Sequence, residues 1–93
     1  MATLGSWNID ELKPCNLTQR AASAFTELMS RIVGADYMPV LYVGKQLVNG
    51  VNYCILAVQT LVTANPTKRL VKMVIHEGFD GSVSMKSIRG IEL

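Results

Sequence analysis

The stretch QLVNGVNYCILAVQTLVT, residues 46–63, decides the fold. Asn49-Gly50 near its start is a strong turn signal, because both residues tolerate the positive φ angles of a two-residue hairpin. The residues after the turn, 51–63, are rich in β-branched side chains and predict a long strand. A turn this tight joins antiparallel neighbours, so we expect the preceding strand to run back along the same sheet.

Further strands lie on both sides of this hairpin. The sequence predicts three more, each rich in β-forming residues: 38–47, 68–76 and 82–93. Pro39 falls near the beginning of the first, where a missing N–H donor is tolerated. The connections at 64–67 and 77–81 are too short for the crossover that parallel neighbours need. We therefore expect a four-stranded antiparallel meander with residues 82–93 at one edge.

One helix precedes the sheet. Apolar side chains recur at helical spacing over residues 17–33: Leu17, Ala21, Ala24, Phe25, Leu28 and Ile32. Asn16 is the expected N-cap, with Gln19 as its capping-box partner, and Gly34 can end the helix. The predicted class is α+β, with this N-terminal helix packed on the sheet and with Phe25, Leu28 and Ile32 buried. Residues 1–15 form an extended arm, and residues 1–93 form one domain.

The strand at 51–63 is apolar on both of its faces. Four apolar residues share one face (Tyr53, Ile55, Ala57 and Leu61), and four share the other (Cys54, Leu56, Val58 and Val62). A sheet with one face in water alternates apolar and polar residues instead. The second face therefore predicts an exposed apolar patch or a contact with a second copy of the chain.

Composition restricts the function. Hydrophobic residues make up 49% of the chain and charged residues 17%, a balance that is typical of a globular domain. The net charge of +2 is spread along the sequence, so we do not expect nucleic acid as a partner. The longest apolar run, 53–58, is far below the roughly 20 residues of a bilayer-spanning helix. With no apolar leader at the N-terminus, we expect no membrane partner and a cytoplasmic location.

The reactive side chains do not form a recognisable catalytic or metal-binding pattern. His76 is the only histidine and falls at the end of a predicted strand. Cys15 and Cys54 belong to no CxxC pair, so we expect two reduced thiols, with a single bridge between them as the alternative. We therefore expect a protein that is not an enzyme and that uses no metal and no cofactor. A protein surface is the expected partner.

The segment QLVNGVNY, residues 46–53, resembles the Gln-x-Val-x-Gly motif of the cystatin family. The Asn-Tyr pair that follows the motif is similar to the sequence at this place in the intracellular, stefin-like members. The order of the surrounding elements, from an early glycine at Gly5 to the last strand, is also similar. The resemblance implies one helix wrapped by a curved antiparallel sheet. It also implies reversible inhibition of papain-like cysteine proteases.

The resemblance further implies which residues contact the protease. They are Leu4 and Gly5 in the arm, Gln46, Leu47, Val48, Asn49 and Gly50 in the first hairpin, and Phe79 at the tip of the second. The sequence departs from many cystatins because the second hairpin has no Pro-Trp pair, and Trp7, in the arm, is the only tryptophan. The chain between Pro39 and Gln46 is also shorter than in familiar members.

Two functions stay open. The first is a protease inhibitor that presents no scissile bond and acts through the arm and both hairpins. The second is a cystatin-like scaffold that inhibits nothing, and that forms a homodimer or binds a partner protein through its apolar sheet face. The hairpin at 46–50 favours the inhibitor, because a scaffold does not need a turn of this form.

Overall fold

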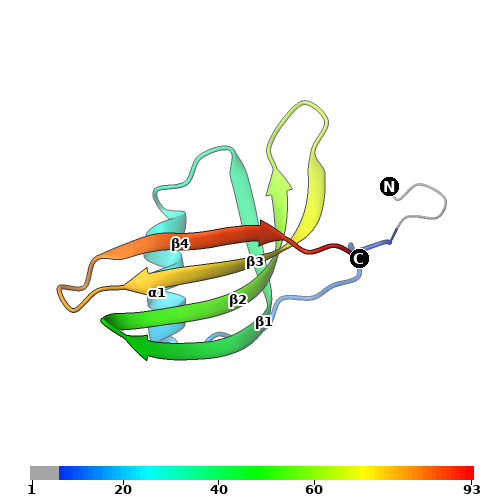
Figure 1. The fold of residues 1–93 in the computed structure, drawn as a ribbon. Helices are drawn as coiled ribbons and strands as arrows, with labels where there is room; N and C mark the ends of the chain where they lie inside the picture. Colours follow the sequence, from blue (N-terminus) through cyan, green and yellow to red (C-terminus); the bar gives the residue numbers. More distant parts are fainter. Residues whose placement is uncertain (1–6) are drawn as a thin grey trace.

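The computed structural model describes residues 7–93, which form one helix and four strands. The elements in chain order are α1 (Gln19–Met29), β1 (Ala35–Val48), β2 (Gly50–Leu61), β3 (Thr67–Glu77) and β4 (Val83–Gly90). The sheet has the order β1-β2-β3-β4, and each neighbouring pair is antiparallel. Figure 1 shows α1 lying across one face of the curved sheet. The predicted α+β class and the antiparallel meander are confirmed.

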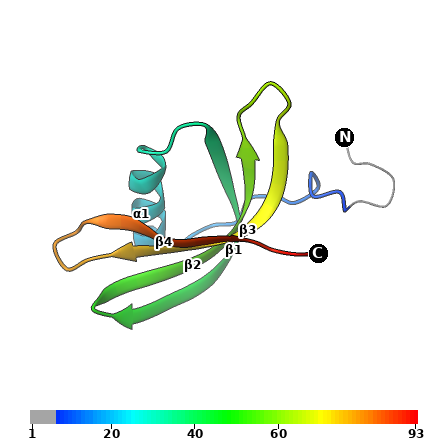
Figure 2. The ribbon, with the colours of Figure 1, turned by 45° about the horizontal axis from the view of Figure 1, so that its top comes forward.

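The first strand is longer and more irregular than predicted. It begins at Ala35 rather than Met38, and its register with β2 shifts between Pro39 and Leu41 and again between Tyr42 and Gly44. Each shift places an extra residue in β1, and such bulges bend a strand and increase its twist. The bulges therefore help β1 to follow the curvature of the sheet around the helix (Figure 2).

The helix is shorter than predicted at its N-terminal end. It begins at Gln19, and Thr18 rather than Asn16 is the N-cap. The Thr18 Oγ1 accepts a hydrogen bond from the Ala21 N–H at 3.3 Å. Both Asn16 and Thr18 are good caps, and the structure uses Thr18, whose backbone has the extended conformation of an N-cap.

The helix also ends earlier than the predicted residue 33. Its last residue is Met29, followed by Ser30 as the C-cap. The Ser30 hydroxyl donates to the Glu27 carbonyl at 2.6 Å, and such local bonds compete with continued helix. Leu28 is buried, as predicted, but Phe25 and Ile32 are only partly buried.

The core lies between α1 and the sheet. Three β2 side chains (Tyr53, Ile55 and Ala57) and three β3 side chains (Val71, Met73 and Ile75) face the helix with no more than 1% exposure. The buried residues of the helix are Ala21, Ala24 and Leu28, which belong to the same core cluster. The small side chains of Ala21 and Ala24 let the helix backbone approach the sheet closely.

The opposite face of the sheet is only partly covered. Val58 is 5% exposed, and its registered neighbour Leu70 lines an apolar groove together with Ile9, Leu12 and Leu93. The arm and the C-terminal residues thus cover one end of this face. Leu56 is half-buried and Val62 is 59% exposed, so the predicted apolar patch is present in part.

Cys15 and Cys54 are free cysteines in the structure, and both are half-buried. Within residues 7–93, no helix has the length and apolar composition of a bilayer-spanning segment.

Candidate functional site

The first hairpin turns about Asn49. The β1–β2 register pairs Leu47 with Val51 and Val48 with Gly50. The predicted two-residue turn with positive φ at both Asn49 and Gly50 is wrong, since Gly50 (φ +104°) has a positive φ and no described non-glycine residue does. Counted from the pair Leu47 and Val51, the connection is residues 48–50 and ends in a positive-φ glycine, which is another common hairpin form. This turn leaves Leu47 75% and Val48 41% exposed at its tip.

Gly50 joins the first hairpin to the second. It is buried, and a Cβ at this position would lie 2.9 Å from His76 Cε1 and 3.2 Å from Gly78 Cα, and closer still to the Glu77 carbonyl oxygen. The site therefore excludes side chains by contact as well as by backbone angle. Gly50 was expected to contact a protease, but the surface that approaches it here is the end of β3.

A chain of hydrogen bonds links the two hairpins at their bases. Gln46, Asn52 and His76 are in register across β1, β2 and β3. Asn52 is 4% exposed, and its Nδ2 donates to Gln46 Oε1 at 3.1 Å. Its Oδ1 lies 2.8 Å from His76 Nδ1, which donates when the proton is on that nitrogen. The buried amide thus holds side chains of both neighbouring strands.

The second hairpin is held by its own hydrogen bonds. The Gly78 N–H donates to the Ser82 carbonyl at 2.8 Å, and the Gly81 N–H donates to the Gly78 carbonyl at 3.0 Å. Asp80 Oδ1 accepts from the Ser82 N–H at 2.9 Å and from the Ser82 hydroxyl at 2.7 Å. These two bonds to Ser82 lower the pKa of the Asp80 carboxyl. The closed turn leaves Phe79 84% exposed at the tip.

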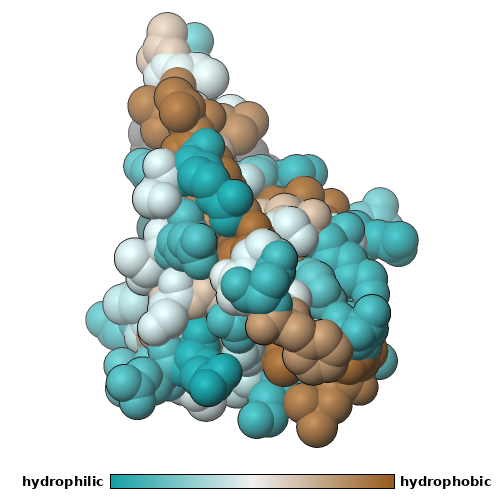
Figure 3. Space-filling model, turned by 90° about the vertical axis from the view of Figure 1, so that its left-hand side faces the viewer, coloured by the Kyte–Doolittle hydropathy of each residue, from teal (hydrophilic) through white to brown (hydrophobic). Residues whose placement is uncertain are grey.

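Leu47, Val48 and Phe79 are the exposed apolar side chains of the two hairpin tips, and we call them the hairpin patch. Both hairpin tips lie at the same end of the sheet (Figure 1). Figure 3 views this end, and hydrophobic side chains gather at its lower right. Gln46 and Asn49 are also exposed in the first hairpin, so most of the expected first-hairpin residues are exposed at the same end of the sheet as Phe79.

A second contact supports the patch from the helix side of the sheet. The Tyr53 hydroxyl donates to Glu77 Oε1 at 2.9 Å, and Glu77 is the residue whose backbone packs on Gly50. Burial of the phenol and the bond to Glu77 raise the pKa of Tyr53. The sequence did not reveal these linking roles of Asn52, Tyr53, His76 and Glu77, because they depend on the β2–β3 register.

The arm lies at the other end of the sheet. Leu4 and Gly5 fall outside the described residues. Trp7, the first described residue, lines a hollow with Pro66 and Thr67, and Asp10 Oδ1 accepts from Lys68 Nζ at 3.1 Å. From the hairpin patch to that end, β2 extends about 35 Å along the chain. The described part of the arm therefore does not join the hairpins in a single wedge.

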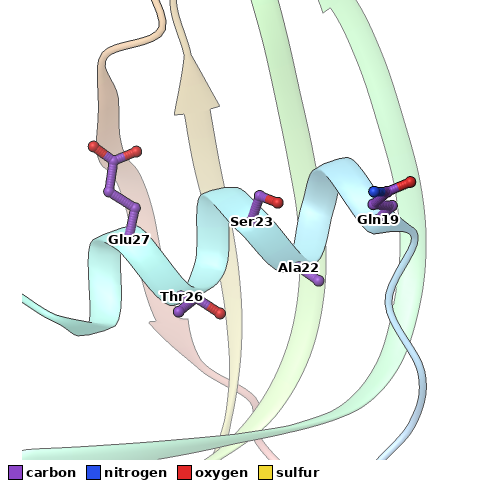
Figure 4. Close-up of a pocket in the computed structure, with 5 residues that line it drawn as sticks. All are labelled: Gln19, Ala22, Ser23, Thr26 and Glu27. Carbon is purple, nitrogen blue, oxygen red and sulfur yellow. The ribbon is translucent and has the colours of Figure 1, made fainter.

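The remaining features do not form a second site of this kind. A shallow hollow on the exposed side of α1 is lined by Gln19, Ala22, Ser23, Thr26 and Glu27, whose side chains spread apart rather than converge (Figure 4). Within residues 7–93, no three His, Cys, Asp or Glu side chains are close enough to hold a metal ion. No known protein family, curated protein or solved structure matches this chain. The hairpin patch, with the contacts of Gly50, Asn52 and Tyr53 that hold its two turns, is therefore the candidate functional site.

Proposed function

We propose that the protein is a reversible inhibitor of papain-like cysteine proteases that inserts the hairpin patch into the protease cleft. The observation that carries the proposal is the presence of three exposed apolar side chains on two turns that are fastened to each other. The resemblance of residues 46–50 to the cystatin motif supports the choice of protease class.

Rigidity is the first argument. Binding costs about 0.5–1.5 kcal/mol for each flexible side chain that it immobilises, and more where a loop must be ordered. Here the first turn is fixed by Gly50 against Glu77, and the second by the bonds between Gly78 and Ser82. Little backbone order is lost on docking, so most of the gain from burying apolar surface is retained.

The size of the patch is the second argument. Phe79 is 84% exposed and Leu47 is 75% exposed, so docking would bury most of both side chains. Full burial of a Leu or Phe side chain is worth about 1.5–3 kcal/mol. An aromatic residue and an aliphatic residue on rigid supports are typical anchors of a protein interface.

The form of the turns is the third argument. Proteases cleave extended segments, whereas residues 47–51 turn back on themselves with Leu47 paired to Val51. Cleavage would require this pairing and the contact at Gly50 to open. A hairpin tip of this kind can bind in a protease cleft and dissociate without being cleaved.

The position of the arm restricts the proposal to the hairpins. The resemblance places Leu4 and Gly5 at the protease, but Trp7 lies beside Pro66 and Thr67, far along β2 from the patch. We therefore propose a two-hairpin contact that does not require the arm. Removal of residues 1–5 is expected to change the inhibition constant less than any substitution in the hairpin patch.

The test measures papain activity with a fluorogenic substrate. Val48→Asp places a charge in the contact and should raise the inhibition constant at least a hundredfold, since an unpaired buried charge costs about 3–5 kcal/mol. Val62→Asp is the matched control, because Val62 is also exposed (59%) but lies at the other end of β2. Both variants should keep the parent Tm within about 4 °C, since exposed substitutions change stability by about 0.5 kcal/mol or less.

The outcome that overturns the proposal is full papain activity in the presence of micromolar parent protein. In that case the alternative function, a non-inhibitory scaffold that binds a partner or a second copy through its apolar sheet face, takes its place. One observation favours that alternative: Leu41, directly opposite Leu56 on that face, is 51% exposed.

A further inference from the structure

The sheet face opposite α1, which we call the outer face, is divided into an apolar part and a basic part. The strand registers define rows of side chains that cross the sheet. One row runs Gly44, Cys54, Val74 and Ser87 across the four strands, and the next runs Leu41, Leu56, Lys72 and Arg89. Within the second row, two aliphatic residues on β1 and β2 are followed by two cations on β3 and β4.

The apolar part is not shielded as the core is. Ile55 and Met73, which face the helix, are fully buried, whereas Cys54, Leu56 and Val74 on the outer face are only half-buried. Leu41 is 51% exposed. Ile9 and Leu12 of the arm lie with Leu70, one row farther along the outer face, and Leu56 is not among the described residues that line that groove.

The basic part is a pair of like charges. Lys72 and Arg89 are directly opposite each other on neighbouring strands, and both are exposed. Like charges in this position are destabilising. Neither forms a salt bridge, since the one ion pair found in residues 7–93 is that between Lys68 and Asp10.

Glu92 is the acidic residue nearest to Arg89 in the sequence; it is exposed after the end of β4 and forms no salt bridge within residues 7–93. Glu77 accepts the Tyr53 hydroxyl on the helix side, and Asp80 is bonded to Ser82 in the second hairpin. Asp36 is on the outer face, but it is in register with Thr60, four residues along β2 from Leu56, which is about 13 Å. Within residues 7–93, the two cations beside the apolar strip therefore have no salt-bridge partner.

We propose that the outer face binds an acidic segment of a partner protein. A carboxylate of the segment lies between Lys72 and Arg89 and accepts hydrogen bonds from both, and the apolar side chain two residues along the segment lies on Leu56 and Leu41. Arg and Lys donate to carboxylates in shorter and stronger bonds than neutral donors do. This surface is separate from the hairpin patch, so one copy of the protein can bind a protease and the acidic segment at the same time.

A protein segment fits this surface better than an anionic membrane. Stable adhesion to lipid takes a cluster of several basic residues, and here two are unpaired. The apolar side chains also lie on the strands of a sheet rather than on a projecting loop that could enter the bilayer. In an extended segment, residues two apart point to the same side about 6.8 Å from each other, so an acidic residue with an apolar residue two positions along fits the row.

The test uses two fluorescein-labelled twelve-residue peptides, one with the repeat Glu-Ser-Leu-Ser and the other with the repeat Lys-Ser-Leu-Ser, so that the charged and apolar side chains share one face. Fluorescence anisotropy at 50 mM salt should show that the parent binds the Glu peptide at least tenfold more tightly. Arg89→Glu should weaken this binding at least tenfold. Because it converts a repulsive pair into an attractive one, it should also raise Tm by about 2–6 °C.

Lys45→Glu is the matched control, since Lys45 is registered with Tyr53 and so belongs to the helix side of the sheet. It has the same charge change and should keep the parent affinity for the Glu peptide. Equal binding of both peptides, or a fall in Tm with Arg89→Glu, would overturn the proposal. So would binding to phosphatidylserine vesicles without binding to the peptide. Papain inhibition should be the same for Arg89→Glu and parent, so failure here and failure of the proposed function are separable.

Discussion

Replacing Gly50 by alanine tests the contact on which the hairpin patch depends. The added Cβ would lie 2.9 Å from His76 Cε1 and against the Glu77 carbonyl oxygen, which belongs to the backbone and cannot rotate away. The residue also has φ +104°, which a side chain disfavours. Both effects act in the same direction, so the two hairpins must move apart or the variant must lose stability.

The magnitude follows from the two terms. A non-glycine residue at positive φ costs about 1–3 kcal/mol, and overpacking of a tight contact costs about 1–3 kcal/mol more. The sum, about 2–6 kcal/mol, is a large part of the 5–15 kcal/mol that stabilises a typical domain. For a domain of this size we expect Tm to fall by about 10 °C or more.

Gly34→Ala is the control for backbone strain alone. Gly34 also has a positive φ, +87°, but a Cβ there would have no atom within 4 Å. Its Tm should fall by about half as much as that of Gly50→Ala. The difference between the two variants reports the contact with β3.

Thermal unfolding by circular dichroism, with papain inhibition measured at 20 °C, checks both consequences. At that temperature a folded Gly50→Ala variant should inhibit at least tenfold more weakly than Gly34→Ala, because its hairpin tips are no longer fastened together. Equal Tm values for the two glycine variants would refute the reasoning, and so would parent-like inhibition by Gly50→Ala.

Three further predictions concern the groups around the patch. Asn52→Leu should lower the free energy of unfolding by about 1–3 kcal/mol, because it leaves Gln46 and His76 without their shared partner, and urea unfolding measures this. The raised pKa of Tyr53 contributes stability that is present below about pH 10 and lost as the pH rises through the folded pKa. Measured Tm values should therefore decline less steeply above about pH 10 in Tyr53→Phe than in the parent. The lowered pKa of Asp80 contributes stability that is present above about pH 4 and lost as the pH falls through the folded pKa. Asp80→Asn should accordingly weaken the dependence of Tm on pH between 2 and 5, and an unchanged acid profile would contradict the assignment.

The strands were predictable because their signals are local. The β-branched residues along 51–63 and the turn residues around them determine where β2 runs and that its neighbours are antiparallel. The apolar stripe of α1 likewise indicates which helix face is buried, as Leu28 shows. The predicted ends of α1 were wrong. At the N-terminus, Asn16 and Thr18 are both good caps, and the sequence alone does not choose between them. At the C-terminus, the local bond of the Ser30 hydroxyl competes with continued helix.

The candidate site was predictable only in part. Exposed tips at Val48 and Phe79 follow from turn signals and from the family resemblance. The burial of Gly50 does not, since it depends on how β3 passes the first turn. The bridging role of Asn52 depends on the same register. The place of the arm beside Pro66 is a long-range contact that no local pattern indicates.

The two bulges of β1 also bear on how the protein stays dispersed. An edge strand of 14 residues with few charges is a template on which other chains can add strands and begin to aggregate. The register shifts after Pro39 and after Tyr42 interrupt that edge, and the Cys15 N–H already occupies the Pro39 carbonyl at 2.9 Å. What is left in regular spacing is two short runs, from Ala35 to Pro39 and from Gly44 to Val48. An incoming strand would therefore find few consecutive partners along β1, which disfavours fibril growth from this side of the sheet.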